Sequence, residues 1–470
     1  MRFLRVPTQC NISMYFFIAV KIMTTKVTSG ITYLDNNATT KTCDEAKQVM
    51  ADWIQSCSNA SGSSFLSQAS QLLINKAISY VNTLCKLKNE YMVIFTSGAS
   101  ESNCSIIHMT VDAWHHNVGT VPHIVTTSIE HKSILECLDT LVEQNRIEVT
   151  LIDPNMYGVT DPEAIEKALR GNTALVTVMF ANNEIGSINP VKKIAEIVHK
   201  RNIPFHTDAV QIFGKLKLDI PGMNIDALSM SFHKLYGPPG VGMLIIRKSF
   251  VEGYKLRAQI AGTQQNGLRG GTENVPAIAG AIAAMKWNFN NRNSKNKRLR
   301  TLRDLTIKLL EKNLNRVDYN KFYDMDKDDD DTDDSDEILV KKDIDNIRSQ
   351  SKGKDGKKTT SKSGKEFVVL GPPQNKVDSY LPSTLLISII DNEKPFCNVK
   401  FKNELEKNKI IVSIGSACNT KSTKASHVLE AIRAPAIVKR GVLRISFSDY
   451  NTTDDIKKFI NVFFATLKTI

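Results

Sequence analysis

Short apolar segments alternate with amphipathic segments through most of the first 285 residues. The apolar segments are rich in β-branched and aromatic residues and have the length of single strands. They are Tyr91–Phe95, His123–Thr127, Ala174–Phe180, Pro204–Thr207, Ala227–Met230 and Gly242–Arg247. Helical patterns lie between them, such as Val191–Arg201 with the sequence VKKIAEIVHKR. Strands separated by helices of this length predict βαβ units on a mixed, mostly parallel sheet, and therefore an α/β fold.

A smaller pattern follows towards the end of the chain. Its segments are Ser383–Ile390, Phe401–Asn408, Ile410–Ser413, Ser426–Ile432 and Val442–Phe447. Strand-like and helix-like runs are mixed here, which predicts an α+β unit. We therefore expect an N-terminal extension at residues 1–30, a large domain at 31–285 and a small C-terminal domain at 286–470.

A charged segment at about residues 324–365 interrupts the small domain. Residues 324–337 contain nine Asp and one Glu, and residues 341–365 are rich in Lys, Ser, Gly and Thr. Such segments carry too few apolar side chains to form a core, so we expect a disordered, solvated insertion. A partner-binding segment displayed from a loop is the alternative.

Composition narrows the class of protein. The 470 residues carry 41% hydrophobic and 23% charged residues, which is typical of globular proteins. The net charge of +12 comes with no nucleic-acid-binding motif, so we expect a solvated basic surface and no nucleic acid partner. The eight cysteines include no C-x-x-C pair, which argues against a metal site or a disulfide framework and favours a reducing compartment.

The N-terminal segment fits a targeting signal only weakly. Two arginines lie within residues 1–5 and a short apolar run covers residues 14–20, but no clear cleavage site follows. No stretch reaches the roughly 18 apolar residues that a membrane span needs. We expect no membrane association and a cytoplasmic location, and the ambiguous extension leaves a mitochondrial location open.

The chemistry-bearing residues follow the ends of predicted strands, where ligands bind in parallel sheets. A small, hydroxyl-rich turn after Phe95 enters a helix, and helix N-termini bind phosphate. Asp208 and Gln211 follow another strand, and Lys234 ends a third before a Pro/Gly turn. Each residue alone is more often a helix cap or a surface side chain. Together they suit pyridoxal 5′-phosphate, which needs a phosphate seat, an anion at its ring nitrogen and a lysine for its aldehyde.

Eight segments resemble the cysteine desulfurases of the NifS/IscS type, which are class-V aminotransferase-like, fold-type I enzymes dependent on pyridoxal phosphate. They are YLDNNATTK (33–41), FTSGASESN (95–103), SIEHKSIL (128–135), ANNEIGSINP (181–190), HTDAVQ (206–211), SFHKLYGPPGVG (231–242), LRGGTENV (268–275) and SIGSACNT (413–420). The segments keep the family's order and cover residues 31 to about 455, so the resemblance omits only the extension and the charged insertion.

The resemblance implies a role for each matching residue. Lys234 would carry the cofactor, Asp208 would pair with its ring nitrogen and Gln211 would bond its phenolic oxygen. His131 would stack on the ring and move protons. Asn183 would contact cofactor and substrate, and Arg444 would clamp the substrate carboxylate. The phosphate would be held by Ala99, Ser100, Ser231 and His233, and by Thr272 from the other subunit of a homodimer.

Cys418 would complete the site as a nucleophile. Gly415, Ser416 and Ala417 before it are small, and polar residues follow it. The resemblance implies that its thiolate takes sulfur from L-cysteine, leaving L-alanine, and passes the persulfide to an acceptor or iron–sulfur scaffold protein. No resident metal is expected, although Cys418 would be able to ligate an iron–sulfur cluster transiently.

Three segments depart from the family pattern, and these departures bear on catalytic efficiency and on the choice of acceptor, not on the core reaction. The segments are Ser63–Leu66, Leu381–Thr384 and Ala261–Thr263. A selenocysteine lyase or another class-V enzyme would keep Lys234 and Asp208 without needing Cys418. A non-catalytic scaffold subunit would be expected to lose Lys234, Asp208 or Cys418, and all three are present.

Overall fold

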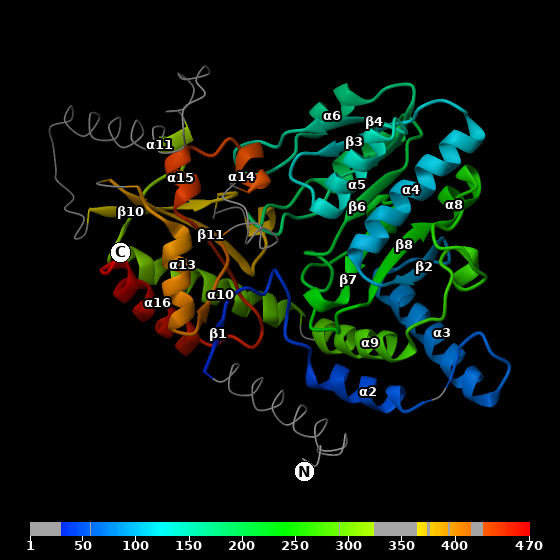
Figure 1. Cartoon of the computed structure of the whole chain (residues 1–470), viewed down its shortest axis with the longest axis horizontal. Helices are drawn as coiled ribbons and strands as arrows, with labels where there is room; N and C mark the ends of the chain where they lie inside the picture. Colours follow the sequence, from blue (N-terminus) through cyan, green and yellow to red (C-terminus); the bar gives the residue numbers. More distant parts are fainter. Residues whose placement is uncertain are drawn as a thin grey trace, which may run out of the picture.

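A computed structural model describes most of the chain. The described residues are 30–56, 58–290, 292–323, 364–373, 377–392, 395–414 and 426–470. Two lobes lie side by side, with the large sheet in one lobe and helices α10 (Arg292–Glu311), α13 (Asn398–Lys407) and α16 (Thr453–Leu467) in the other (Figure 1). The charged insertion lies outside the described residues except for Gly364 and Lys365, and Lys365 begins strand β10.

A seven-stranded sheet forms the large lobe. Its order is β2-β8-β7-β6-β5-β3-β4, where only β8 runs antiparallel to its neighbours. The strands are β2 (Tyr91–Thr96), β3 (His123–Thr127), β4 (Glu148–Ile152), β5 (Thr173–Thr177), β6 (Phe205–Asp208), β7 (Ala227–Ser231) and β8 (Gly242–Arg247). This mixed, mostly parallel sheet confirms the α/β prediction. Strand β4 was not predicted, because it is a partly exposed edge strand that lacks a continuous apolar run.

Helices cover both faces of this sheet. They are α2 (Asp44–Ile54), α3 (Phe65–Cys85), α4 (Ala99–Asn117), α5 (Lys132–Glu143), α6 (Pro162–Ala168), α7 (Val191–His199), α8 (Lys248–Tyr254) and α9 (Val275–Phe289). Alternate strand residues enter different cores: Ile94 packs with α4 and α5, whereas Val93 and Phe95 pack with α2, α3 and α9. Burial on both faces explains why these strands read as continuous apolar runs.

The second lobe is built on a four-stranded sheet of order β13-β11-β10-β9. Its strands are β9 (Asn315–Arg316), β10 (Lys365–Leu370), β11 (Thr384–Asp391) and β13 (Val442–Ser446). Helices α10, α13 and α16 pack on one face, and short helices pack on the other. The short helices are α11 (Asn320–Tyr323), α14 (His427–Ala431) and α15 (Ala436–Arg440). Strands and helices mix here as the α+β pattern predicted.

The N-terminal segment of the described chain belongs with the second lobe. Strand β1 (Thr32–Tyr33) pairs in parallel with β12 (Ile410–Ile411), and Leu34 is buried among residues of α10, α13 and α16. Helix α9 continues through position 285, where the domain boundary was expected. The expected boundaries therefore remain predictions. None of the helices in the described residues is long and apolar enough to cross a membrane.

Candidate active site

Asp208 lies at the carboxyl end of β6, in the middle of the large sheet. Its side chain is 5% exposed. Asn103 Nδ2 of α4 donates to Asp208 Oδ2 at 2.9 Å, and the Val210 amide donates to Oδ1 at 3.0 Å. Among the described residues, no cation forms an ion pair with this carboxylate. A buried carboxylate with hydrogen-bond donors but no charge partner fits a protonated ring nitrogen.

The N-terminus of α4 lies where the sequence predicted a phosphate seat. The helix begins at Ala99 directly after Gly98, and both Ala99 and Ser100 keep solvent exposure. Gly242 lets β8 pass close to this turn, because a Cβ there would lie 2.5 Å from the Gly98 carbonyl carbon. Ser231 Oγ also lies beside Gly98, 3.9 Å from where a Cβ would stand. The structure therefore brings Ser231 to the helix terminus, where backbone N–H groups and the helix dipole favour an anion.

Lys234 follows β7 on a short 3-10 helix, η2 (Phe232–Lys234). Its Nζ donates to the carbonyl oxygens of Asn37 at 2.8 Å and Ala38 at 2.6 Å. The neighbouring His233 contacts Thr39 Oγ1 through Nδ1 at 3.0 Å. Burial, together with the nearby Lys234, lowers the pKa of His233 to about 4, so its imidazole is neutral at physiological pH.

Asn37 connects the large lobe with the second lobe at this point. Its carbonyl oxygen also accepts from Gln211 Nε2 at 3.2 Å. Its side-chain Nδ2 donates to the Asn183 carbonyl oxygen at 3.0 Å and to Thr384 Oγ1 of β11 at 2.7 Å. Asn37 thus forms hydrogen bonds with Lys234, Gln211 and the Asn183 backbone, and also with strand β11 of the other lobe.

His131 lies beside Asp208 and caps helix α5. Its Nδ1 accepts from the Ser133 amide at 3.1 Å and contacts Ser133 Oγ at 2.8 Å. Ser133 Oγ in turn accepts from Asn103 Nδ2 at 3.1 Å, which links His131 to Asp208 through one amide. Burial of the ring among protein atoms lowers the pKa of His131, the negative charge of Asp208 raises it, and the positive charge of Lys234 lowers it further. His131 therefore caps α5 and is linked to Asp208, and its role at the cofactor ring stays a prediction.

Arg444 of β13 is buried at the junction between the lobes, with 1% exposure. One terminal nitrogen lies 2.7 Å from Asp35 Oδ1, and the other donates to the Asn183 carbonyl oxygen at 3.3 Å. Its Nε has no hydrogen-bond partner in the described residues. A buried guanidinium with an unused donor fits the predicted carboxylate clamp.

Among the described residues, Thr272 is a predicted site residue that is not brought to this cluster. Thr272 lies exposed in the loop between η3 (Gln265–Gly267) and α9, and no hydrogen bond joins it to the other predicted residues. Its role at a partner subunit's phosphate stays a prediction. Cys418 and the rest of the segment 415–425 lie outside the described residues.

Several residues of the cluster carried no role in the sequence prediction. Asn37, Asp35 and Asn103 lie inside the matching segments, and Lys215 follows one of them. Asn103 comes one turn into α4, so its place beside the phosphate turn was a usable signal. The partners of Asn37 and Asp35 come from positions far along the chain, and no local pattern indicates such contacts.

Comparisons with known proteins identify the family of the chain. A family model described as Aminotransferase class-V matches residues 32–333. The chain is 33% identical over 433 residues to "Cysteine desulfurase IscS" of Clostridium botulinum (strain Hall), with 92% of each chain covered. A solved NifS-like protein matches with a TM-score of 0.73 and 27% identity, over 93% of this chain and 99% of that chain.

A further solved structure, described as SspA in complex with cysteine, matches with a TM-score of 0.63 and 27% identity, over 89% of this chain and 99% of that chain. Enzymes of this family use pyridoxal 5′-phosphate, and the buried Asp208 and the α4 terminus fit that cofactor. The chain therefore belongs to the class-V aminotransferase family and, within it, to the cysteine desulfurases of the NifS/IscS type.

Proposed function

We propose that this enzyme removes sulfur from L-cysteine at Lys234, and that Cys418 receives the sulfur while L-alanine is released. The observation that carries the assignment of residues is the convergence of Asp208, Lys234 and Gln211 at the ends of adjacent strands. Arg444 reaches the same place from the other lobe through the Asn183 carbonyl.

The cofactor, when bound, supplies an electron sink for the substrate carbon. Asp208 would keep the ring nitrogen protonated, since a buried carboxylate favours a cation beside it. The phosphate would be held by the α4 terminus at Ala99 and Ser100 together with Ser231 and His233. Gln211 would donate to the phenolic oxygen from Nε2, which in this structure donates to the Asn37 carbonyl.

The substrate is held by its charged groups. Arg444 would bind the carboxylate of L-cysteine in two-pronged fashion, and Asn183, whose carbonyl oxygen accepts from Arg444, would contact cofactor and substrate. His131 accepts or returns a proton, because its lowered pKa keeps the imidazole neutral at physiological pH.

Cys418 attacks the substrate sulfur as a thiolate. The bond between substrate carbon and sulfur breaks, the sulfur stays on Cys418 as a persulfide, and the carbon skeleton is protonated to alanine. A second thiol, on an acceptor or iron–sulfur scaffold protein, then takes the terminal sulfur. We propose a homodimer in which Thr272 reaches the phosphate of the partner subunit, and a cytoplasmic or mitochondrial location.

The test records the absorbance spectrum of the purified holoenzyme with and without L-cysteine, and it measures the alanine that is formed. We expect a cofactor band that shifts on addition of L-cysteine. Borohydride reduction and peptide mapping should place the pyridoxyl group on Lys234, and Lys234→Ala should lose the covalent link while keeping its fold. A label on another lysine contradicts the assignment.

A further inference from the structure

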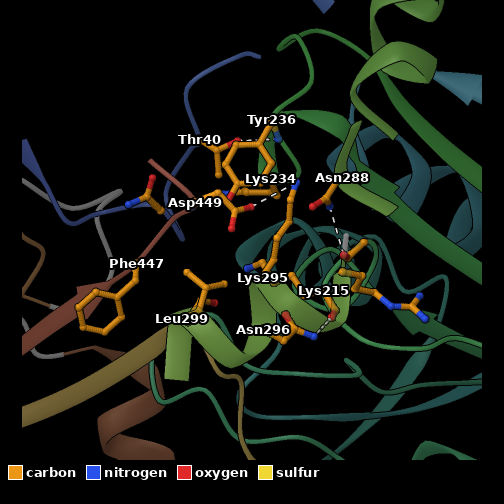
Figure 2. A pocket seen from close by; sticks show the side chains of 14 residues that line it. Thr40, Lys215, Lys234, Tyr236, Asn288, Lys295, Asn296, Leu299, Phe447 and Asp449 are labelled. Carbon is orange, nitrogen blue, oxygen red and sulfur yellow. Dashed lines mark hydrogen bonds and ion pairs between the residues drawn. The ribbon is translucent and has the colours of Figure 1, made fainter. Parts of the chain in front are cut away.

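Lys215 is a second lysine at the site, and neither the sequence prediction nor the proposed mechanism gives it a role. It lies four residues after Gln211, in the turn beyond β6. Its Nζ donates to Gln211 Oε1 at 2.9 Å. Lys215 and Lys234 line one pocket at the junction of the two lobes, together with Lys295 and Asp449 (Figure 2).

The contact with Lys215 fixes which way the Gln211 amide points. The Asn37 carbonyl only accepts, so it selects Nε2, and this leaves Oε1 at the other end of the amide to accept from Lys215 Nζ. Nε2 is therefore turned towards the carbonyl that Lys234 also contacts. Without Lys215, the amide would lose one of the two contacts that set its orientation.

The backbone around Lys215 is held from two helices. Asn288 Nδ2 of α9 donates to the Gly214 carbonyl oxygen at 3.2 Å, and Asn296 Nδ2 of α10 donates to the Lys215 carbonyl oxygen (Figure 2). Gly214 has φ +79°, and a Cβ there would collide with the Asn288 amide. This turn is thus built to place the Lys215 side chain behind Gln211, which is unlike a surface lysine.

We propose that Lys215 is a positioning residue that orients the Gln211 amide and sets the protonation of the cofactor link on Lys234. The inference rests on the proposed roles of Lys234 and Gln211. It names a residue that acts through Gln211 and through its own charge, without touching substrate.

Charge at this position acts directly on Lys234. Lys215 faces Lys234 and Arg444, and burial together with these two cations lowers its pKa to about 7. Arg292 and Lys295 of α10 also line the pocket, with Asp449 opposite Lys295 at 3.5 Å and Asp35 paired with Arg444. The nitrogen that would join Lys234 to the cofactor carries a positive charge when it is protonated. A nearby cation disfavours that charge, and a donor to the phenolic oxygen stabilises the deprotonated form, so both would lower the pKa of this nitrogen.

The test measures the pH midpoint of the cofactor absorption band in the holoenzyme. Lys215→Met removes both the charge and the donor, so we expect the midpoint to move up by about one pH unit. Lys215→Arg keeps both and should restore a midpoint close to that of the wild type. Lys217→Met, at an exposed lysine two residues away, is the matched control and should leave the midpoint unchanged.

A second variant distinguishes a folding defect from a true shift in the pH midpoint of the cofactor band. Lys215→Gln keeps a donor and loses the charge, so it should give a smaller upward shift than Lys215→Met. Thermal unfolding shows which variants fold. Equal midpoints in the wild type and in a folded Lys215→Met or Lys215→Gln variant overturn the proposal. If the wild type shows no band that borohydride fixes on Lys234, the proposed function itself is wrong, and the two failures are thus distinguished.

Discussion

Replacement of Arg444 by Gln should abolish the preference for substrates that carry a carboxylate. Arg444 is 1% exposed, and within the described part of the chain its Nε has no hydrogen-bond partner, whereas its two terminal nitrogens contact Asp35 and the Asn183 carbonyl. A hydrogen bond to a charged group contributes about 1.5–3 kcal/mol. Because the two bonds of one clamp are not fully additive, we take about 3–4 kcal/mol for the clamp as a whole. At about 1.4 kcal/mol per tenfold, kcat/KM for L-cysteine should fall by about 100- to 1000-fold.

The assay compares L-cysteine with cysteamine, which has the thiol and amine but no carboxylate. Arg444→Gln should lose activity on L-cysteine and change little on cysteamine. Arg303→Gln removes another buried arginine, on α10, whose Nε donates to the Thr384 carbonyl, and it is the matched control for loss of a buried cation. Equal losses on both substrates would show that Arg444 acts only by holding β13 against Asp35, and would refute the clamp.

Three further changes test other parts of the site. Asp208→Asn should bind cofactor but turn over poorly, because the ring nitrogen loses its anionic partner; alanine formation within a few-fold of wild type would contradict this. The second change replaces residues 324–363 by a short Gly/Ser linker and keeps Lys365 with its 3.1 Å contact to Asp391. Alanine formation in the presence of a small thiol that accepts the sulfur should be unchanged, and a large loss of activity would show that the segment packs against the fold. Because the pKa of His131 is lowered in the free enzyme, the acid limb of the kcat/KM profile should lie below the usual histidine range, with activity lost as pH falls through that lowered pKa. His131→Gln should remove this limb, and an unchanged limb would exclude His131 as its source.

The parts of the fold that could be predicted from sequence are those whose signal is local. Strands β2, β3, β7 and β8 are buried on both faces, so their apolar runs marked them to within a residue. Strand β4 escaped because edge exposure mixes polar residues into it. The pairing of β1 with β12 joins positions 32 and 410, and no local pattern indicates such a partner.

The candidate site divides along the same line. Lys234, Asp208 and the Ala99 turn follow strands directly, so the position of each strand also gave the position of its residue. Arg444 and Asn183 required the family resemblance, because their meeting depends on how the lobes pack. Asn37 contacts the site through its backbone carbonyl, and Lys215 contacts the side-chain amide of Gln211. Neither contact can be predicted from residue type or spacing.

The central claim is that Cys418 carries the sulfur. Mass spectrometry of peptides from holoenzyme treated with L-cysteine measures this directly, with the other seven cysteines as internal controls. We expect one added sulfur on the peptide that contains Cys418, and none on that peptide in Cys418→Ser, which should still bind cofactor but release little alanine because a hydroxyl cannot carry a persulfide. Sulfur on a different cysteine, or alanine released by Cys418→Ser at the wild-type rate, would contradict the mechanism.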